Sequence, residues 1–145
     1  MQERSPAQVY ALVIGAVLVA AGIIGFFYEA SFAAGEGDVK ADAVLGILDV
    51  NGWHNVVHLA SGVAGLALAG SYVGARGYAL GLAVVYTVVA VWGFILGDGE
   101  AILNLVPVNT EDNVLHALIA VAGFGAYAAT PAVPAPTTRP AAPAT

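Results

Sequence analysis

Cysteine is absent from this chain of 145 residues, and only 10% of its residues are charged. The lack of cysteine excludes disulfide bonds and thiolate metal ligands. Soluble domains are typically about 25% charged. Lysine and arginine together number four, and the net charge of −6 argues against a nucleic-acid-binding surface. Hydrophobic residues make up 59% of the chain, and the partner that this composition predicts is a lipid bilayer.

Long apolar runs predict helices that cross the bilayer. A hydrocarbon core of about 30 Å takes about 20 helical residues. We expect four such helices, at about residues 7–28, 52–72, 78–96 and 110–129, with a tight turn at residues 74–77. The first run is longer than the h-region of a signal peptide, which has about 7–15 residues, so we expect it to be retained. The predicted fold class is all-α: an integral membrane four-helix bundle over residues 1–129.

The sequence also repeats itself. Residues 43–65 align without a gap with residues 101–123, and the identical pairs include Asn51 with Asn109, Asn55 with Asn113, and His58 with His116. The first and third predicted helices match as well, and the pairs there include Tyr10 with Tyr78 and Gly25 with Gly93. Two helices per unit return the chain to its starting side. The sequence therefore predicts two parallel two-helix repeats, related by an axis near the membrane normal.

The basic residues predict an orientation. Arg4, Arg76 and Arg139 fall on one side of the predicted helices, and only Lys40 falls on the other. By the positive-inside rule, both termini then lie in the cytoplasm. This pattern is typical of a multi-pass protein of the cell membrane.

The remaining segments are too short or too polar to span. Residues 43–50 and 101–108 are apolar but short, and we expect them to pack at the membrane interface. Residues 130–145 are rich in proline, alanine and threonine, and we expect them to form a disordered cytoplasmic tail. Tyr10 and Tyr78 are expected in the aromatic belt at the inner interface.

Polar residues recur on one face of the second and fourth predicted helices. We call them the Asn/His stripe: Asn51, Asn55 and His58, with Asn109, Asn113 and His116. Polar groups in a membrane helix must face the bundle interior, so we expect the two halves of the stripe to face each other. Small residues at Gly62, Gly65 and Gly123 would allow the two helices to approach closely.

The simplest interpretation of the stripe is structural. Asn51 and Asn109 precede apolar helices and are expected to be N-caps. Asn55 and Asn113 are expected to form hydrogen bonds between the two helices. The imidazoles of the stripe are then neutral and bonded to an asparagine or a carbonyl across the repeat axis.

The alternative interpretation is a metal site. His54 and His58 stand four residues apart on one face, and Asp112 and His116 repeat this spacing. Three imidazoles and one carboxylate make a plausible set of ligands for zinc, copper or iron. Haem would use only His58 and His116, with room made by the glycines of the same helices. Positive helix N-termini beside the site disfavour a cation, and no cofactor is assigned from sequence.

Two further interpretations remain open. A proton or solute path along the stripe would make the protein a small transporter or channel subunit. No nucleophile with an adjacent base, no phosphate-binding loop and no pair of facing acids can be identified. We therefore expect a non-enzymatic membrane scaffold or partner-binding subunit, which could form homo-oligomers or bind another membrane protein.

The chain resembles a known family. The residues that carry the resemblance are Val44 to Gly46, the pattern VNxxHNxxHLxxG at Val50 to Gly62, and NxxDNxLH at Asn109 to His116. They are similar to those of the four-helix membrane proteins known only as domain of unknown function 4383. The resemblance extends from about Gln8 to Ala129. It implies the fold and the location, but no activity, ligand or residue role.

Overall fold

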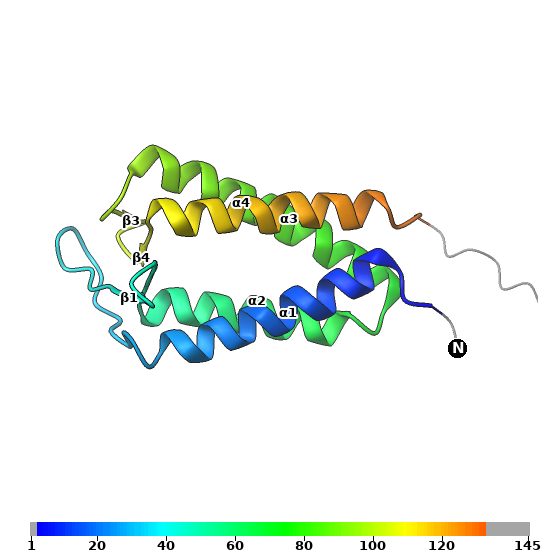
Figure 1. Ribbon diagram of the computed structural model, residues 1–145, viewed down its shortest axis with the longest axis horizontal. Coiled ribbons are helices and arrows are strands. Elements are labelled where there is room, and N and C mark those ends of the chain that lie inside the picture. The colour runs from blue at the N-terminus through cyan, green and yellow to red at the C-terminus, as the bar shows by residue number, and fades with distance from the viewer. Residues whose placement is uncertain (1–2, 133–145) are drawn as a thin grey trace, which may run out of the picture.

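Four helices form the body of the molecule in a computed structural model that describes residues 3–132 (Figure 1). In chain order the elements are α1 (Pro6–Gly25), β1 (Asp42–Val44), β2 (Leu48–Val50), α2 (Gly52–Leu68), α3 (Tyr72–Leu96), β3 (Ala101–Ile102), β4 (Val106–Pro107) and α4 (Thr110–Ala128). The all-α fold class with four helices is confirmed. Most of the predicted tail, residues 133–145, lies outside the described residues.

Local sequence explains where α1 begins. Ser5 is its N-cap: the Ser5 hydroxyl accepts a hydrogen bond from the Gln8 N–H, and the Gln8 side chain accepts one from the Ser5 N–H. Pro6 is at the first helical position, and because proline has no backbone N–H it leaves no donor there without a partner. The helix ends at Gly25, earlier than the predicted residue 28, because the next residues form a tighter turn in which the Tyr28 N–H donates to the Gly25 carbonyl.

The boundary between α2 and α3 differs from the prediction. Helix α2 ends at Leu68 rather than at residue 72, and α3 begins at Tyr72 rather than at residue 78. The Ser71 hydroxyl caps α3 by accepting a hydrogen bond from the Gly74 N–H. Residues 74–77, which we expected to form a turn, are therefore helical. The local capping hydrogen bond prevails over the turn preference of the glycines.

Two short β-hairpins occupy residues 43–50 and 101–108, which we expected to be short apolar segments at the membrane interface. Strand β1 pairs antiparallel with β2, and β3 pairs antiparallel with β4. Both loops use left-handed backbone at equivalent positions: Leu45 and Gly46 in the first, Leu103 and Asn104 in the second. Glycine and asparagine are the residues that adopt this conformation most readily. The hairpins cap the end of the bundle that lies opposite both ends of the described chain (Figure 1).

The helices pack as two close pairs. Helix α1 packs mainly on α2, and α3 packs mainly on α4. The predicted close approach of α2 and α4 through small residues is wrong. A Cβ atom on Gly62 would collide with Gly15 and Val19 of α1, whereas Gly65 and Gly123 accommodate tyrosine side chains from α3 and α1. The glycines thus fit α1 and the tyrosines, and α2 and α4 leave room for side chains between them.

Those tyrosines lie in the core, so the expected inner aromatic belt is wrong at these two positions. Tyr10 of α1 and Tyr78 of α3 are 7% and 8% exposed. The Tyr10 hydroxyl donates to the Ile119 carbonyl of α4 at 2.9 Å, and the Tyr78 hydroxyl donates to the Ser61 carbonyl of α2 at 3.1 Å. Each bond satisfies a buried hydroxyl and joins one close helix pair to the other.

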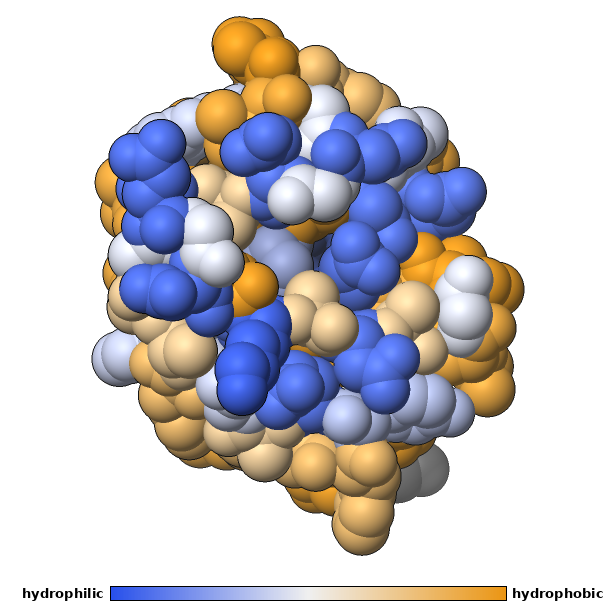
Figure 2. Space-filling view, turned by 90° about the vertical axis from the view of Figure 1, so that its left-hand side faces the viewer, coloured by the Kyte–Doolittle hydropathy of each residue, from blue (hydrophilic) through white to orange (hydrophobic). Residues whose placement is uncertain are grey.

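The exterior of the bundle is apolar along its sides and polar at the hairpin end. Large side chains such as Val17, Val85 and Leu118 are about half exposed or more. Figure 2 shows hydrophilic residues gathered on the hairpin end, with hydrophobic residues around them. Within residues 3–132, two helices, α1 and α3, are long and apolar enough to cross a membrane by length and composition.

The opposite end holds both ends of the described chain. The Ala7 N–H donates to the Thr130 hydroxyl at 2.9 Å, and Arg76 Nε donates to the Thr130 carbonyl at 2.9 Å. Thr130 is 1% exposed, although we expected the tail to begin here and to bury nothing. The packed unit therefore extends at least one residue beyond the predicted boundary at 129.

We expect Gly93→Ala to destabilise the protein by about 1–3 kcal/mol. A Cβ atom at Gly93 of α3 would collide with the side-chain amide of Asn113. Gly81→Ala, in the same helix, is the matched control, because a Cβ atom there meets nothing within 4 Å. Unfolding of both variants in mild detergent would measure the difference. Equal stability of the two variants would contradict the prediction.

Candidate metal centre between α2 and α4

Asn51 and Asn109 each form two hydrogen bonds that hold the hairpin end together. The Asn51 Oδ1 accepts from the His54 N–H, and the Asn109 Oδ1 accepts from the Asp112 N–H, both at 2.9 Å. Both predicted N-caps are therefore confirmed. The amide nitrogens reach across: Asn51 Nδ2 donates to the Leu105 carbonyl and Asn109 Nδ2 to the Ile47 carbonyl, both at 2.7 Å. Each helix start is thus tied to the opposite hairpin.

Asn55 and Asn113 do not join α2 to α4 as we expected. Asn55 Nδ2 donates to the Glu29 carbonyl at 2.9 Å. The Oδ1 atoms of Asn55 and Asn113 are buried and have no hydrogen-bond partner within the described chain. They lie against Gly25 of α1 and Gly93 of α3, respectively, where a Cβ atom would collide with them. These amides therefore belong to the packing within each close helix pair.

The three histidines of the chain converge in the space that remains between α2 and α4. One nitrogen from each of His54, His58 and His116 lies within 4.8 Å of the other two. The ring centroids of His54 and His58 are 4.4 Å apart, and those of His54 and His116 are 5.9 Å apart. His54 and His116 are buried and His58 is half-buried. We call these three residues the histidine cluster.

Asp49 of β2 orients His54 of the cluster and Asp112 beside the cluster. Its carbonyl oxygen lies 2.9 Å from His54 Nδ1, which identifies Nδ1–H as the donor. His54 Nε2 then keeps its lone pair, as in metal-binding histidines whose other nitrogen donates to a carbonyl. The Asp49 N–H donates to Asp112 Oδ2 at 2.9 Å. The sequence interpretation did not identify this role of Asp49, because the residue aligned with it is Pro107, which has no N–H.

The hydrogen bonds that we expected from His58 and His116 to an asparagine or a carbonyl are not observed. Within the described chain no hydrogen bond joins these two imidazoles, and the buried Nδ1 of His116 has no partner. The Tyr86 ring stands edge-on to His116, with centroids 5.0 Å apart. Buried polar atoms almost always have a partner, so an unpartnered imidazole nitrogen in a cluster of three favours a bound ligand.

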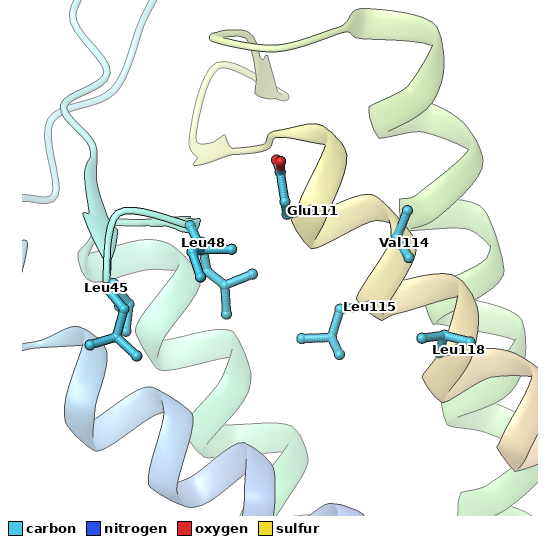
Figure 3. A pocket seen from close by; sticks show the side chains of 8 residues that line it. Leu45, Leu48, Glu111, Val114, Leu115 and Leu118 are labelled. Carbon is cyan, nitrogen blue, oxygen red and sulfur yellow. The ribbon is translucent and has the colours of Figure 1, made fainter.

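A cavity of about 440 Å³ adjoins the cluster. We call it the lateral cavity. His58, Asp112 and His116 line its inner end, and apolar residues of α1, the first hairpin and α4 form its walls. A second hollow of about 280 Å³ adjoins it and shares Val44, Leu48 and Leu115 as lining residues. Figure 3 shows the side chains of Leu48 and Leu115 pointing toward each other from the first hairpin and α4.

Of the four predicted ligands, the structure gathers three and places the fourth beside them. Asp112 is 2% exposed and lines the same cavity as His58 and His116, but its carboxylate is not one of the converging ligand atoms. No lysine or arginine within the described residues forms a salt bridge with it. Buried carboxylates are usually paired or bound to a metal, so Asp112 is suited to balance a cation held by the cluster.

The arrangement is less suited to haem. Haem would need space beside His58 and His116 made by Gly62, Gly65 and Gly123. In the structure these glycines accommodate helix α1 and the two buried tyrosines instead. The His54 ring also lies close to that of His58, with centroids 4.4 Å apart. A single ion fits this packing better than a porphyrin does.

Burial raises the pKa of the Asp49 carboxyl above its usual value of 3.8, and the neighbouring acids Asp98, Glu111 and Asp42 add to the effect. The nearby side-chain amide of Asn109 favours the ionised form and offsets part of this shift. The Asp49 carboxyl is therefore more readily protonated in the folded state than in the unfolded chain.

The family model described as Domain of unknown function (DUF4383) matches residues 8–129. No curated protein and no solved structure matches the chain.

We expect Asn51→Ala to destabilise the protein more than Ser71→Ala does. Both substitutions remove an N-cap, at a cost of about 1 kcal/mol, but only Asn51 also bonds to the opposite hairpin. The lost amide bond adds about 1 kcal/mol and leaves the Leu105 carbonyl without its partner. Thermal unfolding of the two variants would measure the difference, and equal losses would contradict the cross-hairpin role.

We expect Asp49→Asn to raise the midpoint of thermal unfolding at pH 7 and to have no such effect below about pH 4. The raised pKa means that Asp49 adds stability while it is protonated, below its usual value of 3.8, and that this stability is lost as the pH rises through the folded-state pKa. The asparagine side chain stays neutral throughout. Asp38→Asn, in the exposed loop before β1, is the control, because Asp38 is not among the acids that raise the Asp49 pKa. An effect of Asp49→Asn that did not depend on pH would contradict this prediction.

Proposed function

The chain belongs to the DUF4383 family, and from this premise we propose that it is a multi-pass, non-enzymatic membrane protein that holds one transition-metal ion between α2 and α4. The observation that carries the proposal is the convergence of one nitrogen from each of His54, His58 and His116 within 4.8 Å. The metals suited to such imidazole ligands are zinc, copper and iron.

The distribution of apolar surface supports a location in the membrane. In the apolar windows of α1 and α3 only 33% of the residues are buried inside the molecule, whereas the core helix of a soluble protein would be mostly buried. Aliphatic side chains on every helix are exposed along the sides of the bundle, where a soluble protein would have polar residues. We therefore propose that all four helices cross the bilayer, with the hairpins outside and both termini in the cytoplasm.

Reciprocal contacts support two repeats related by an approximate two-fold axis. Tyr10 bonds to Ile119 of the other half, and Tyr78 bonds in the same way to Ser61. The cross-hairpin bonds of Asn51 and Asn109 form an equivalent pair, as do the contacts of Asn55 with Gly25 and of Asn113 with Gly93. In each case the residues of one contact align in the sequence with those of its counterpart. We therefore infer that the two halves arose by duplication and kept the same packing.

Small side-chain movements would complete the metal site. Tetrahedral zinc with nitrogen ligands at about 2.0–2.1 Å places those nitrogens roughly 3.4 Å apart, closer than the 4.8 Å within which the three nitrogens lie here. The bond from His54 Nδ1 to the Asp49 carbonyl already orients Nε2 for coordination. The carboxylate of Asp112 offsets the positive ends of the α2 and α4 dipoles, which disfavour a cation.

The test is elemental analysis of protein purified in mild detergent without a polyhistidine tag. We expect about one equivalent of zinc, copper or iron in the wild-type protein and none in the His58→Ala/His116→Ala variant. Tyr86→Phe is the control, because it removes only the hydroxyl of the ring beside His116 and leaves the imidazoles in place.

Metal should also raise the unfolding midpoint of the wild-type protein and not that of the double variant, because a ligand that binds only the folded state stabilises it. If the wild-type protein neither contains nor binds zinc, copper or iron, the metal proposal fails. The histidines would then act only in helix packing, and the search would turn to partner proteins or further copies of this chain.

A further inference from the structure

The lateral cavity opens on the side of the bundle. Its outer wall includes Val17 and Ile24 of α1 and Leu115 of α4, which are 51%, 47% and 41% exposed. Residues that both line the cavity and face outward mark its mouth. On a membrane protein these side faces meet hydrocarbon, so a molecule that enters here comes from the lipid and not from water.

The inner end of the cavity meets the histidine cluster. His58 and His116 line the cavity and His54 does not, so the cavity lies on the side of the cluster away from His54. Three protein ligands leave the fourth position of a tetrahedral metal open. Asp112 does not fill that position here, because it is not among the converging ligand atoms and its Oδ2 accepts the Asp49 N–H. The open position of a metal held by the three imidazoles would therefore face the cavity.

Charge determines which head group suits this position. A divalent ion with three neutral imidazoles and one nearby carboxylate leaves a net charge of about +1 in a site of low dielectric constant. No acidic residue other than Asp112 lines the lateral cavity. A ligand with one negative charge and an oxygen donor would neutralise the site.

We propose that the lateral cavity binds a single-chain fatty carboxylate from the bilayer, with its carboxylate on the fourth position of the metal and its alkyl chain along α1 and α4. This inference rests on the proposed metal site. The cavity volume of about 440 Å³ is within the range of about 300–1,000 Å³ typical of sites for small molecules. Its walls are apolar except at the inner end, as an amphiphile with one small polar group requires.

The experiment uses the full chain in a non-ionic detergent, loaded with Co²⁺, whose visible absorption reports its coordination. Oleate is titrated into the protein, and oleyl alcohol, which has the same chain and an uncharged head, is titrated in parallel. We expect a saturable change of the Co²⁺ bands with oleate and none with oleyl alcohol.

Two variants locate the site. Ala21 lines the lateral cavity, so Ala21→Trp should weaken oleate binding by about tenfold or more and leave Co²⁺ binding intact. Ala16→Trp, on the exposed face of the same helix and outside the cavity lining, is the matched control and should bind oleate as the wild-type protein does.

The outcomes separate the two proposals. If Co²⁺ does not bind, the metal site fails and this inference fails with it. If Co²⁺ binds but its absorption bands do not respond to oleate, or respond equally to oleyl alcohol, the metal site stands. The proposal that the cavity binds a fatty carboxylate is then overturned. Equal weakening by Ala21→Trp and Ala16→Trp would also overturn the assignment to this cavity.

Discussion

The hydrogen bonds from the side-chain amides of Asn51 and Asn109 are the interactions on which the rest of the hairpin end depends. Each asparagine satisfies an N–H at the start of its own helix and a carbonyl of the opposite hairpin. These bonds fix where β2 lies relative to α2 and α4. Asp49 on that strand then holds His54 by its carbonyl and Asp112 by its N–H. A chain of backbone and amide contacts thus determines the orientation of His54 and of Asp112, which lies beside the histidine cluster.

Glycine and tyrosine explain why the interior contains space where the cluster lies. Gly25 and Gly93 receive the amides of Asn55 and Asn113, and this draws each even-numbered helix onto the odd-numbered helix that precedes it. The tyrosine hydroxyls join the two pairs deeper in the bundle. Helices α2 and α4 are therefore held at a distance from each other that side chains must fill, and imidazoles fill it at the hairpin end. Packing within the pairs creates the site between them.

Much of this organisation could be predicted from the sequence because the chain is apolar and repeated. The number of helices follows from the apolar runs, and the two N-caps follow from Asn51 and Asn109. The family follows from the two motifs that contain these asparagines. The start of α3 could not be placed, because Ser71 caps it through one local bond while the following glycines suggest a turn. The hairpins have only two or three residues per strand, too few for an alternating pattern. Asp49 acts through its backbone, whose contacts do not depend on side-chain type and so left no signal. The burial of Tyr10 and Tyr78 depends on glycines in the other half, which no local pattern indicates.

The difference between His54 and Asp112, which occupy aligned positions, has a consequence for how such a site can be built. Two identical subunits that meet on a two-fold axis must present the same side chain twice, so a symmetric dimer of one such unit could offer only two histidines or two carboxylates at this position. Joining two units in one chain removes that restriction. A single polypeptide can place a neutral donor on one side of an ion and a negative charge on the other, and it can then adjust the charge of the site one residue at a time.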